Sequence, residues 1–128
     1  MSNKIYAYTL PEVLKYNGWL KIDQTSGSVE KRISEQLSQV NLKPEIVFSD
    51  AAVVGKSEIS DKEIHRYLAE HGFQQDGNSE WFRCNADDVL DALNALKEQY
   101  RKEDKRKQLS EKFYEELRNW YYWATEKS

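Results

Sequence analysis

Apolar and polar positions alternate from Lys4 to Leu10, a two-residue period typical of a β-strand. One side of this strand carries two small or aliphatic side chains, Ile5 and Ala7. The other side carries three larger ones, Tyr6, Tyr8 and Leu10. We therefore expect a strand with two different faces, one of them rich in tyrosine.

A second strand is predicted at Trp19–Gln24, directly after the turn-forming pair Asn17-Gly18. Leu20 and Ile22 share one face of it, and the opposite face carries Trp19, Lys21 and Asp23. The two strands would form an antiparallel hairpin.

The following segment changes to a helical period. Val29, Ile33, Leu37 and Val40 recur at helical spacing after an N-cap candidate, Ser28. Pro44 is expected to stop this helix and to open a third strand at Glu45–Ser49, which could extend to Val54.

A second helix is predicted from its capping box, with Ser60 at the N-cap and Glu63 three residues later. Gly72 would end it. A short aromatic strand then covers Glu80–Cys84, and a third helix begins near Asn85 and Asp88. That third helix carries Val89, Leu93, Leu96 and Tyr100 at its apolar positions.

The last segment predicts a separate helix with an apolar stripe. The stripe contains Phe113, Leu117, Trp120, Tyr121 and Ala124. It requires a partner surface, which could belong to the same chain, a second copy or another protein.

Taken together, the elements predict an α+β fold in the order β-β-α-β-α-β-α, plus a C-terminal helix. The sheet would be small, mostly antiparallel and three- to four-stranded, with helices flanking it. We expect one domain over residues 1–96 and a basic, then aromatic, helical extension over residues 97–128.

Composition fits an ordered, water-soluble protein, with 39% hydrophobic and 32% charged residues. The net charge of −3 does not mark a nucleic-acid binder. A local basic stretch exists, however: Lys97, Arg101, Lys102, Lys105, Arg106 and Lys107. Acidic residues interrupt it, so a solvated helix face explains it as well as a binding patch does.

Several classes of site are disfavoured. No apolar run approaches the roughly 20 residues of a membrane span, so no membrane contact is expected. Cys84 is the single cysteine, and no CxxC or HExxH spacing exists, which argues for a cytoplasmic location and against structural zinc. Gly55-Lys56-Ser57 lacks the upstream glycine of a phosphate-binding loop.

Several short motifs, taken in order, resemble those of the GIY-YIG nuclease superfamily. The resemblance covers about residues 4 to 96. Ile5-Tyr6 resembles part of the first motif, and Leu20-Lys21-Ile22-Asp23 occupies the place of the second. Val29–Arg32 resembles the position of the family's arginine, and Ser60–His71 its later helix with a metal-binding glutamate. The runs GWLKIDQT, DKEIHRYLAEHGF and EWFRC resemble GIY-YIG-like domains at the N-terminus of bacterial helicase-type or restriction-associated proteins.

Three positions depart from the family's motifs. Lys4 stands where the first motif has glycine, and Lys21 and Asp23 replace the tyrosine and glycine of the second. Aspartate lacks the conformational freedom of glycine.

The resemblance implies a set of catalytic roles. Tyr6 would act as or assist a general base, and Tyr8 could substitute for it. Lys21 could stabilise an oxyanion or lower the pKa of a tyrosine through its charge. Arg32 would clamp the phosphate with its planar guanidinium. Glu63 would hold Mg²⁺ or Mn²⁺, which suit carboxylate ligands.

Further candidates surround this set. His65 could reach phosphate from the rim. The candidate nucleic-acid-binding or supporting residues are Glu80, Arg66, Lys97 and Arg101.

Each candidate also has a structural explanation. The tyrosines could simply pack under a helix, and Lys21 could keep a strand edge soluble. Arg32 could pair with Glu35 or Gln36, and the capping box alone accounts for Glu63. Asp23 could cap a turn, although it could also be an added acidic ligand. His71 lies on an apolar stripe, where burial is expected.

The leading hypothesis is a metal-dependent DNA endonuclease domain hydrolysing phosphodiester bonds. A second hypothesis is a catalytically impaired module of the same fold that binds DNA. A third is a protein-interaction domain that forms a homodimer, or contacts further domains of a longer protein, through Phe113, Leu117, Trp120 and Tyr121.

Overall fold

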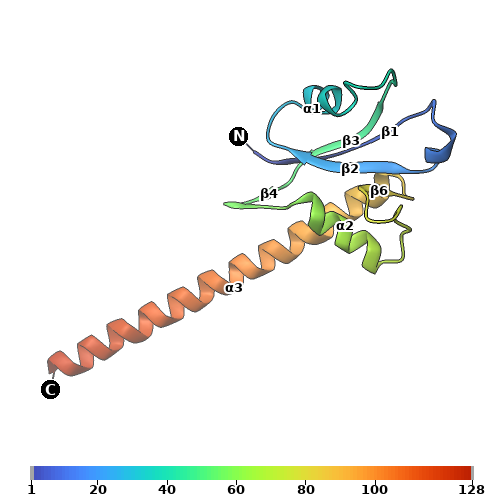
Figure 1. The fold of residues 1–128 in the computed structure, drawn as a ribbon. Coiled ribbons are helices and arrows are strands. Elements are labelled where there is room, and N and C mark those ends of the chain that lie inside the picture. Colours follow the sequence, from blue (N-terminus) through green and yellow to red (C-terminus); the bar gives the residue numbers. More distant parts are fainter. Residues whose placement is uncertain (1, 128) are drawn as a thin grey trace. The chain divides into compact units, whose positions relative to one another are not determined.

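The computed structural model describes residues 2–127. The chain divides between Lys97 and Glu98 into two compact units. The first unit contains a four-stranded antiparallel sheet in the order β3-β1-β2-β6, with helices on both faces (Figure 1). The predicted α+β class is confirmed.

The tyrosine-bearing strand lies in the middle of the sheet. β1 (Lys4–Thr9) and β2 (Leu20–Thr25) form the predicted hairpin, joined through a short 3-10 helix, η1 (Leu14–Tyr16). Gly18 has φ of 83° in this connection, a conformation that favours glycine. Tyr6 pairs with Asp23, so both side chains project from the same face of the sheet.

The two edge strands differ in length. β3 (Glu45–Ala51) runs along the whole of β1, with one register shift. Ala7 pairs with Phe48 and Tyr8 pairs with Ile46, so Val47 is the extra residue of a β-bulge. β6 (Trp81–Phe82) pairs with β2 at its start, through Leu20 and Lys21. The rest of β2 therefore forms an edge that other groups can approach.

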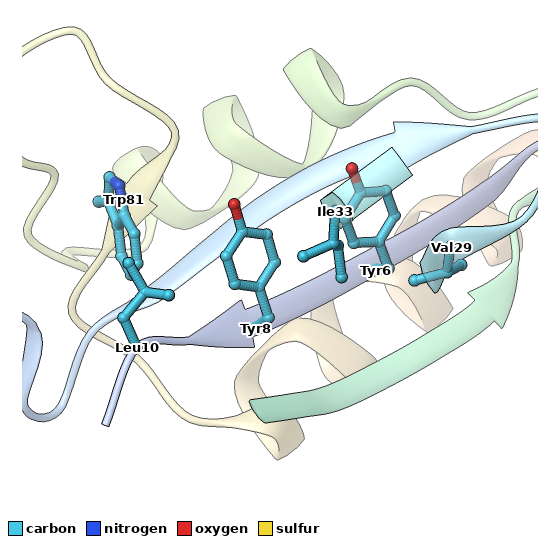
Figure 2. Packing of buried hydrophobic residues seen from close by; sticks show 6 residues of the cluster. All are labelled: Tyr6, Tyr8, Leu10, Val29, Ile33 and Trp81. Atoms are coloured by element: carbon cyan, nitrogen blue, oxygen red, sulfur yellow. The ribbon is translucent and has the colours of Figure 1, made fainter. Parts of the chain in front are cut away.

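One face of the sheet packs against α1 (Val29–Gln36), whose N-cap Ser28 accepts a hydrogen bond from the Lys31 N–H. The buried cluster on this face contains residues of β1, β6 and α1, and one residue that directly follows β1 (Figure 2). Its members are Tyr6, Tyr8, Leu10, Val29, Ile33 and Trp81.

The helix α1 ends at Gln36, earlier than the apolar period through Val40 predicted. Ser38, Val40 and Asn41 have weak helix propensity. The Val40 N–H instead donates to the Leu37 carbonyl at 3.1 Å, which forms a turn.

The opposite face is covered by α2 (Asp61–Glu70) and by the first turns of the last helix (Figure 1). The predicted capping box of α2 is confirmed: the Glu63 carboxylate accepts from the Ser60 N–H at 2.8 Å. Ile64 and Leu68 are fully buried. Before α2, the segment predicted as a loop contributes to a small hairpin of β4 (Val53–Val54) and β5 (Ser57–Glu58).

The two helices predicted after β6 are one continuous helix, α3 (Ala86–Lys127). Asn85 and Asp88 exchange hydrogen bonds of 2.9 Å at its start. Neither glycine nor proline occurs between Ala86 and Lys127, so nothing in the sequence forces an interruption. None of the described helices is sufficiently long and apolar to cross a membrane.

Candidate metal and phosphate site

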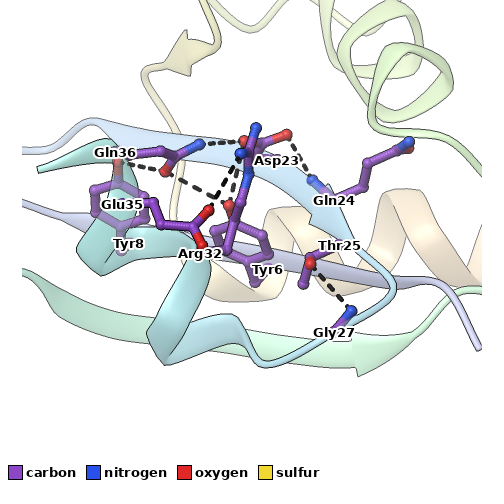
Figure 3. Close-up of polar contacts among 9 residues, drawn as sticks. All are labelled: Tyr6, Tyr8, Asp23, Gln24, Thr25, Gly27, Arg32, Glu35 and Gln36. Carbon is purple, nitrogen blue, oxygen red and sulfur yellow. Dashed lines mark hydrogen bonds and ion pairs between the residues drawn. The ribbon is translucent and has the colours of Figure 1, made fainter. Parts of the chain in front are cut away.

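Asp23 is the centre of a polar network on the α1 face (Figure 3). Its side chain is only 6% exposed. One carboxylate oxygen accepts hydrogen bonds from the Tyr6 hydroxyl at 3.2 Å and from the Gln36 amide, and the other accepts from the Gln24 N–H at 2.7 Å. Asp23 therefore links β1, β2 and the end of α1.

The two tyrosines stand side by side with ring centroids 6.3 Å apart. Both hydroxyls donate to the Gln36 carbonyl oxygen, Tyr8 at 3.1 Å and Tyr6 at 3.5 Å. Burial, reinforced by the charge of Asp23, raises the pKa of Tyr8 to about 12 and raises the pKa of Tyr6 as well. Arg32 opposes both pKa shifts, so its positive charge acts on the two phenols.

Three carboxylates gather beside the start of β6, where the pairing of β6 with β2 stops. One oxygen each from Asp23, Asp61 and Glu80 lies within 4.8 Å of the others. The start of α2 is held there because the Asp61 N–H donates to the Gln24 side-chain oxygen at 2.7 Å. Glu80 is held there because its carbonyl accepts from the Ile22 N–H at 3.0 Å.

The surroundings of this carboxylate cluster disfavour the simultaneous ionisation of all three carboxyl groups. Burial raises the pKa of Asp61, and a hydrogen bond with Asp23 raises it further. Burial also raises the pKa of Glu80, with the charge of Asp23 as the next cause. The Glu80 Oε2 atom is buried and has no hydrogen-bond partner among residues 2–127. A buried carboxylate oxygen in that condition is costly without a cation.

Two basic side chains border the cluster. The His65 ring nitrogen Nε2 lies 2.8 Å from the Ile22 carbonyl, and the ring stacks on Phe82 at 5.2 Å. Lys21 lies with its ammonium 5.9 Å from the centre of the Tyr8 ring. The charges of Lys21 and His65 both lower the pKa of Glu80, so both side chains are electrostatically part of this site.

The donor set fits a hard divalent cation. All three ligands are carboxylates, which suit Mg²⁺ and Mn²⁺ and provide neither the thiolates nor the imidazoles typical of zinc. A bound cation would partner the Glu80 oxygen and would offset both the burial and the neighbouring negative charge that raise the pKa values of Asp61 and Glu80.

The structure brings together most of the predicted site residues. Glu80 is a member of the cluster, Tyr6 donates to Asp23, and the charges of Lys21 and His65 lower the pKa of Glu80. The charges of Asp23 and Glu80 act on Tyr8, and the charge of Arg32 acts on both tyrosines. Arg32 also pairs with Glu35 at 3.8 Å, the ion pair expected from the sequence.

Other predicted site residues lie elsewhere. The Glu63 carboxylate closes the capping box, and Glu63 is not one of the three clustered ligands. Arg66 is exposed on α2. Lys97 pairs with Asp50 of β3 at 3.7 Å, and Arg101, in the second unit, pairs with Glu98 at 3.7 Å.

Two residues of the network were not predicted from the sequence. Asp61 lies four residues before His65, so the helical period places both on one side of α2. Gln36 lies four residues after Arg32 on α1 by the same rule. Asp23 was considered chiefly as a turn cap, although its register opposite Tyr6 in the hairpin indicates its central position.

The fold and this site define a class: a small α+β module with paired tyrosines, a helix arginine and an acidic cluster at the edge of a sheet. A family model for the T5orf172 domain matches residues 5–97, and the chain belongs to that family. The family is part of the GIY-YIG nuclease-like clan, which confirms the resemblance at that level. No curated protein and no solved structure matches the chain.

Proposed function

We propose that the first unit is a divalent-metal-dependent nuclease domain that hydrolyses phosphodiester bonds in DNA. The observation that carries the proposal is the carboxylate cluster of Asp23, Asp61 and Glu80, directly beside Tyr6, in which one Glu80 oxygen has no partner within the described part of the chain. Membership of a nuclease-like clan supports the same chemistry.

In this proposal Asp23, Asp61 and Glu80 hold Mg²⁺ or Mn²⁺. The bound cation would supply charge neutralisation at the phosphate and a more acidic water. The alternative ligand is Glu63, which the resemblance implies. The two possibilities differ in which substitution, at Asp61 or at Glu63, should abolish metal binding.

The tyrosines act as hydrogen-bond donors. Because burial raises both phenol pKa values, neither hydroxyl is ionised near neutral pH, and each can donate to a phosphate oxygen. This favours a donor role over the base role that the resemblance implied for Tyr6. To donate to a phosphate, each hydroxyl would exchange its present bond with Gln36.

Arg32 provides the phosphate clamp. Its side chain is 47% exposed, and among residues 2–127 it forms an ion pair with Glu35 at 3.8 Å, also on the surface. Exposed ion pairs contribute little to stability, so exchanging Glu35 for a phosphate is inexpensive. Lys21 adds positive charge between Tyr8 and Glu80.

The test compares two carboxylates on the same helix. Supercoiled plasmid is incubated with Mn²⁺ and the wild-type chain, Asp61→Asn or Glu63→Gln, and Mn²⁺ binding is measured in parallel by calorimetry. We expect wild type and Glu63→Gln to bind the ion and nick the plasmid, and Asp61→Asn to lose both, with nicking reduced at least about 100-fold. Equal nicking by Asp61→Asn and wild type would assign the activity to another site or a contaminant.

A binding module without chemistry is the second candidate, favoured by one observation. Asp23 stands where the family has glycine and already accepts bonds from Tyr6 and Gln36, which fills the space beside the phenols. This candidate predicts a salt-dependent gel shift with DNA but no nicking by wild type. It also predicts that Asp61→Asn retains the gel shift.

We also propose a cytoplasmic location for this activity. Cys84 is the only cysteine of the chain and is half buried, and burial raises the pKa of its thiol to about 12. A thiol of this kind is stable in a reducing compartment and forms no internal disulfide.

A further inference from the structure

The second unit presents an apolar stripe along α3. Its members are Leu109, Phe113, Leu117, Trp120 and Ala124. At 100° per residue these five positions fall within an arc of about 80° on one side of the helix. The four large side chains among them are between 47% and 67% exposed, which is unusual for aromatic and aliphatic residues at this density.

We propose that this stripe pairs with the same stripe of a second copy of the chain, in antiparallel orientation. This inference does not depend on nuclease activity. It commits to a two-fold symmetric dimer, in which each copy contributes the identical surface.

The side-chain volumes favour the antiparallel arrangement. In an antiparallel pair centred between Arg118 and Asn119, Leu117 of one copy lies opposite Trp120 of the other, and Phe113 lies opposite Ala124. The layer of Phe113 and Ala124 then pairs a large side chain with a small one, and Trp120 meets the smaller Leu117, as close packing requires. A parallel pair would place Trp120 against Trp120 and leave Ala124 against Ala124, which crowds one layer and leaves a gap in another.

Charge favours the same orientation. Residues 97–107 contain six basic and three acidic side chains, a net charge of +3 per copy. A parallel pair would bring the two basic segments alongside each other, where like charges repel. An antiparallel pair places them at opposite ends of the joined stripes.

The buried area is adequate for a specific contact. Aromatic residues bury about 150–250 Å² each when fully covered, and the stripe is flanked by further exposed aromatic residues, Tyr114 and Tyr121. Two copies would together bury roughly 1,200 Å², near the lower limit of specific interfaces. We therefore expect a dimer of micromolar rather than nanomolar affinity.

The first measurement is the mass of the full chain in solution by light scattering at tens of micromolar. Wild type is expected to have the mass of a dimer, and the double variant Phe113→Glu, Leu117→Glu that of a monomer. The matched control is Gln108→Glu, Asn119→Glu, which adds the same two charges on the far side of α3 and should remain dimeric. Circular dichroism shows whether each variant retains its helix.

The second measurement determines orientation. A spin label is attached at Gln108→Cys in a Cys84→Ala background, and the distance between the two labels is measured by pulsed electron paramagnetic resonance. The antiparallel pair predicts about 30 Å or more, because the two sites are offset by 21 residues at 1.5 Å each, whereas a parallel pair predicts less than about 20 Å.

Three results would overturn the proposal: a monomeric wild type, a dimer that survives the stripe variant, or a short distance between labels. A monomeric wild type would mean that another protein, or the first unit, covers the stripe.

Discussion

At the scale of single residues, Glu80 combines burial, a raised pKa and an oxygen without a partner among the described residues. Its folded-state pKa lies above the unfolded value. The carboxyl group is therefore protonated at low pH, where it does not destabilise the fold. The free energy of unfolding falls as the pH rises through the folded-state pKa.

This leads to a prediction for Glu80→Gln in metal-free buffer. The variant should melt a few degrees above wild type at pH 7.5, and the difference should shrink toward pH 4, where Glu80 is protonated in both folded and unfolded chains. Addition of Mn²⁺ should raise the melting temperature of wild type only. If the variant instead melts below wild type at pH 7.5 without metal, the ionised Glu80 carboxylate must be stabilised by an interaction that the structure does not show.

Gln36 supports the tyrosines through a different mechanism, because one side-chain amide satisfies three groups. Replacing Gln36 by leucine removes the Tyr8 acceptor, one of the two acceptors of Tyr6 and a donor to buried Asp23. This should destabilise the protein by roughly 1–3 kcal/mol. Urea unfolding measures the loss. Gln39→Leu makes the same chemical change at an exposed position and should have little effect.

At the scale of elements, the start of α2 depends on the capping box of Ser60 and Glu63. Ser60→Ala should lower the free energy of unfolding by about 1 kcal/mol, measured by urea or thermal unfolding. Glu63→Gln should lower it less, because glutamine also completes a capping box. Ser34→Ala, at an exposed position within α1, is the control and should not be destabilising.

The elements were predictable from the sequence where local patterns determine them. The alternation around Tyr6 and Tyr8, the Asn17-Gly18 turn and the capping box each depend on neighbours within a few residues, and all three are present in the structure. The continuity of α3 was not predicted, because the change of composition from basic to aromatic resembles an element boundary. No helix-breaking residue accompanies that change, so the helix continues.

The carboxylate cluster was only partly predictable for a similar reason. Asp23, Asp61 and Glu80 come from three elements and meet because β6 is two residues long and leaves room beside β2. The length of β6 and the resulting position of α2 depend on tertiary packing, which local sequence patterns do not reveal. The sequence therefore indicated Glu80 and the tyrosines, and it indicated Glu63 as a candidate ligand but not Asp61, the residue that the structure places in the cluster.

At the scale of the whole molecule, every buried hydrophobic residue of the described chain lies at or before Leu96. A chain cut after Lys97 should therefore unfold cooperatively, retain Mn²⁺ binding and be monomeric. Calorimetry and light scattering on the shortened chain test this. Non-cooperative unfolding would show that the second unit is required for the core of the first.

The bulge in β3 has a consequence for how the length of this protein can change. Val47 is the extra residue, so its deletion would leave Ile46 opposite Tyr8 and Phe48 opposite Ala7 in a regular alternation. Loss of one residue in β2 would instead turn Asp23 away from Tyr6 and dismantle the polar network. The loss of a single residue within the sheet is thus tolerable at β3, on the far side of β1 from the carboxylates, and we expect natural deletions among relatives to concentrate there.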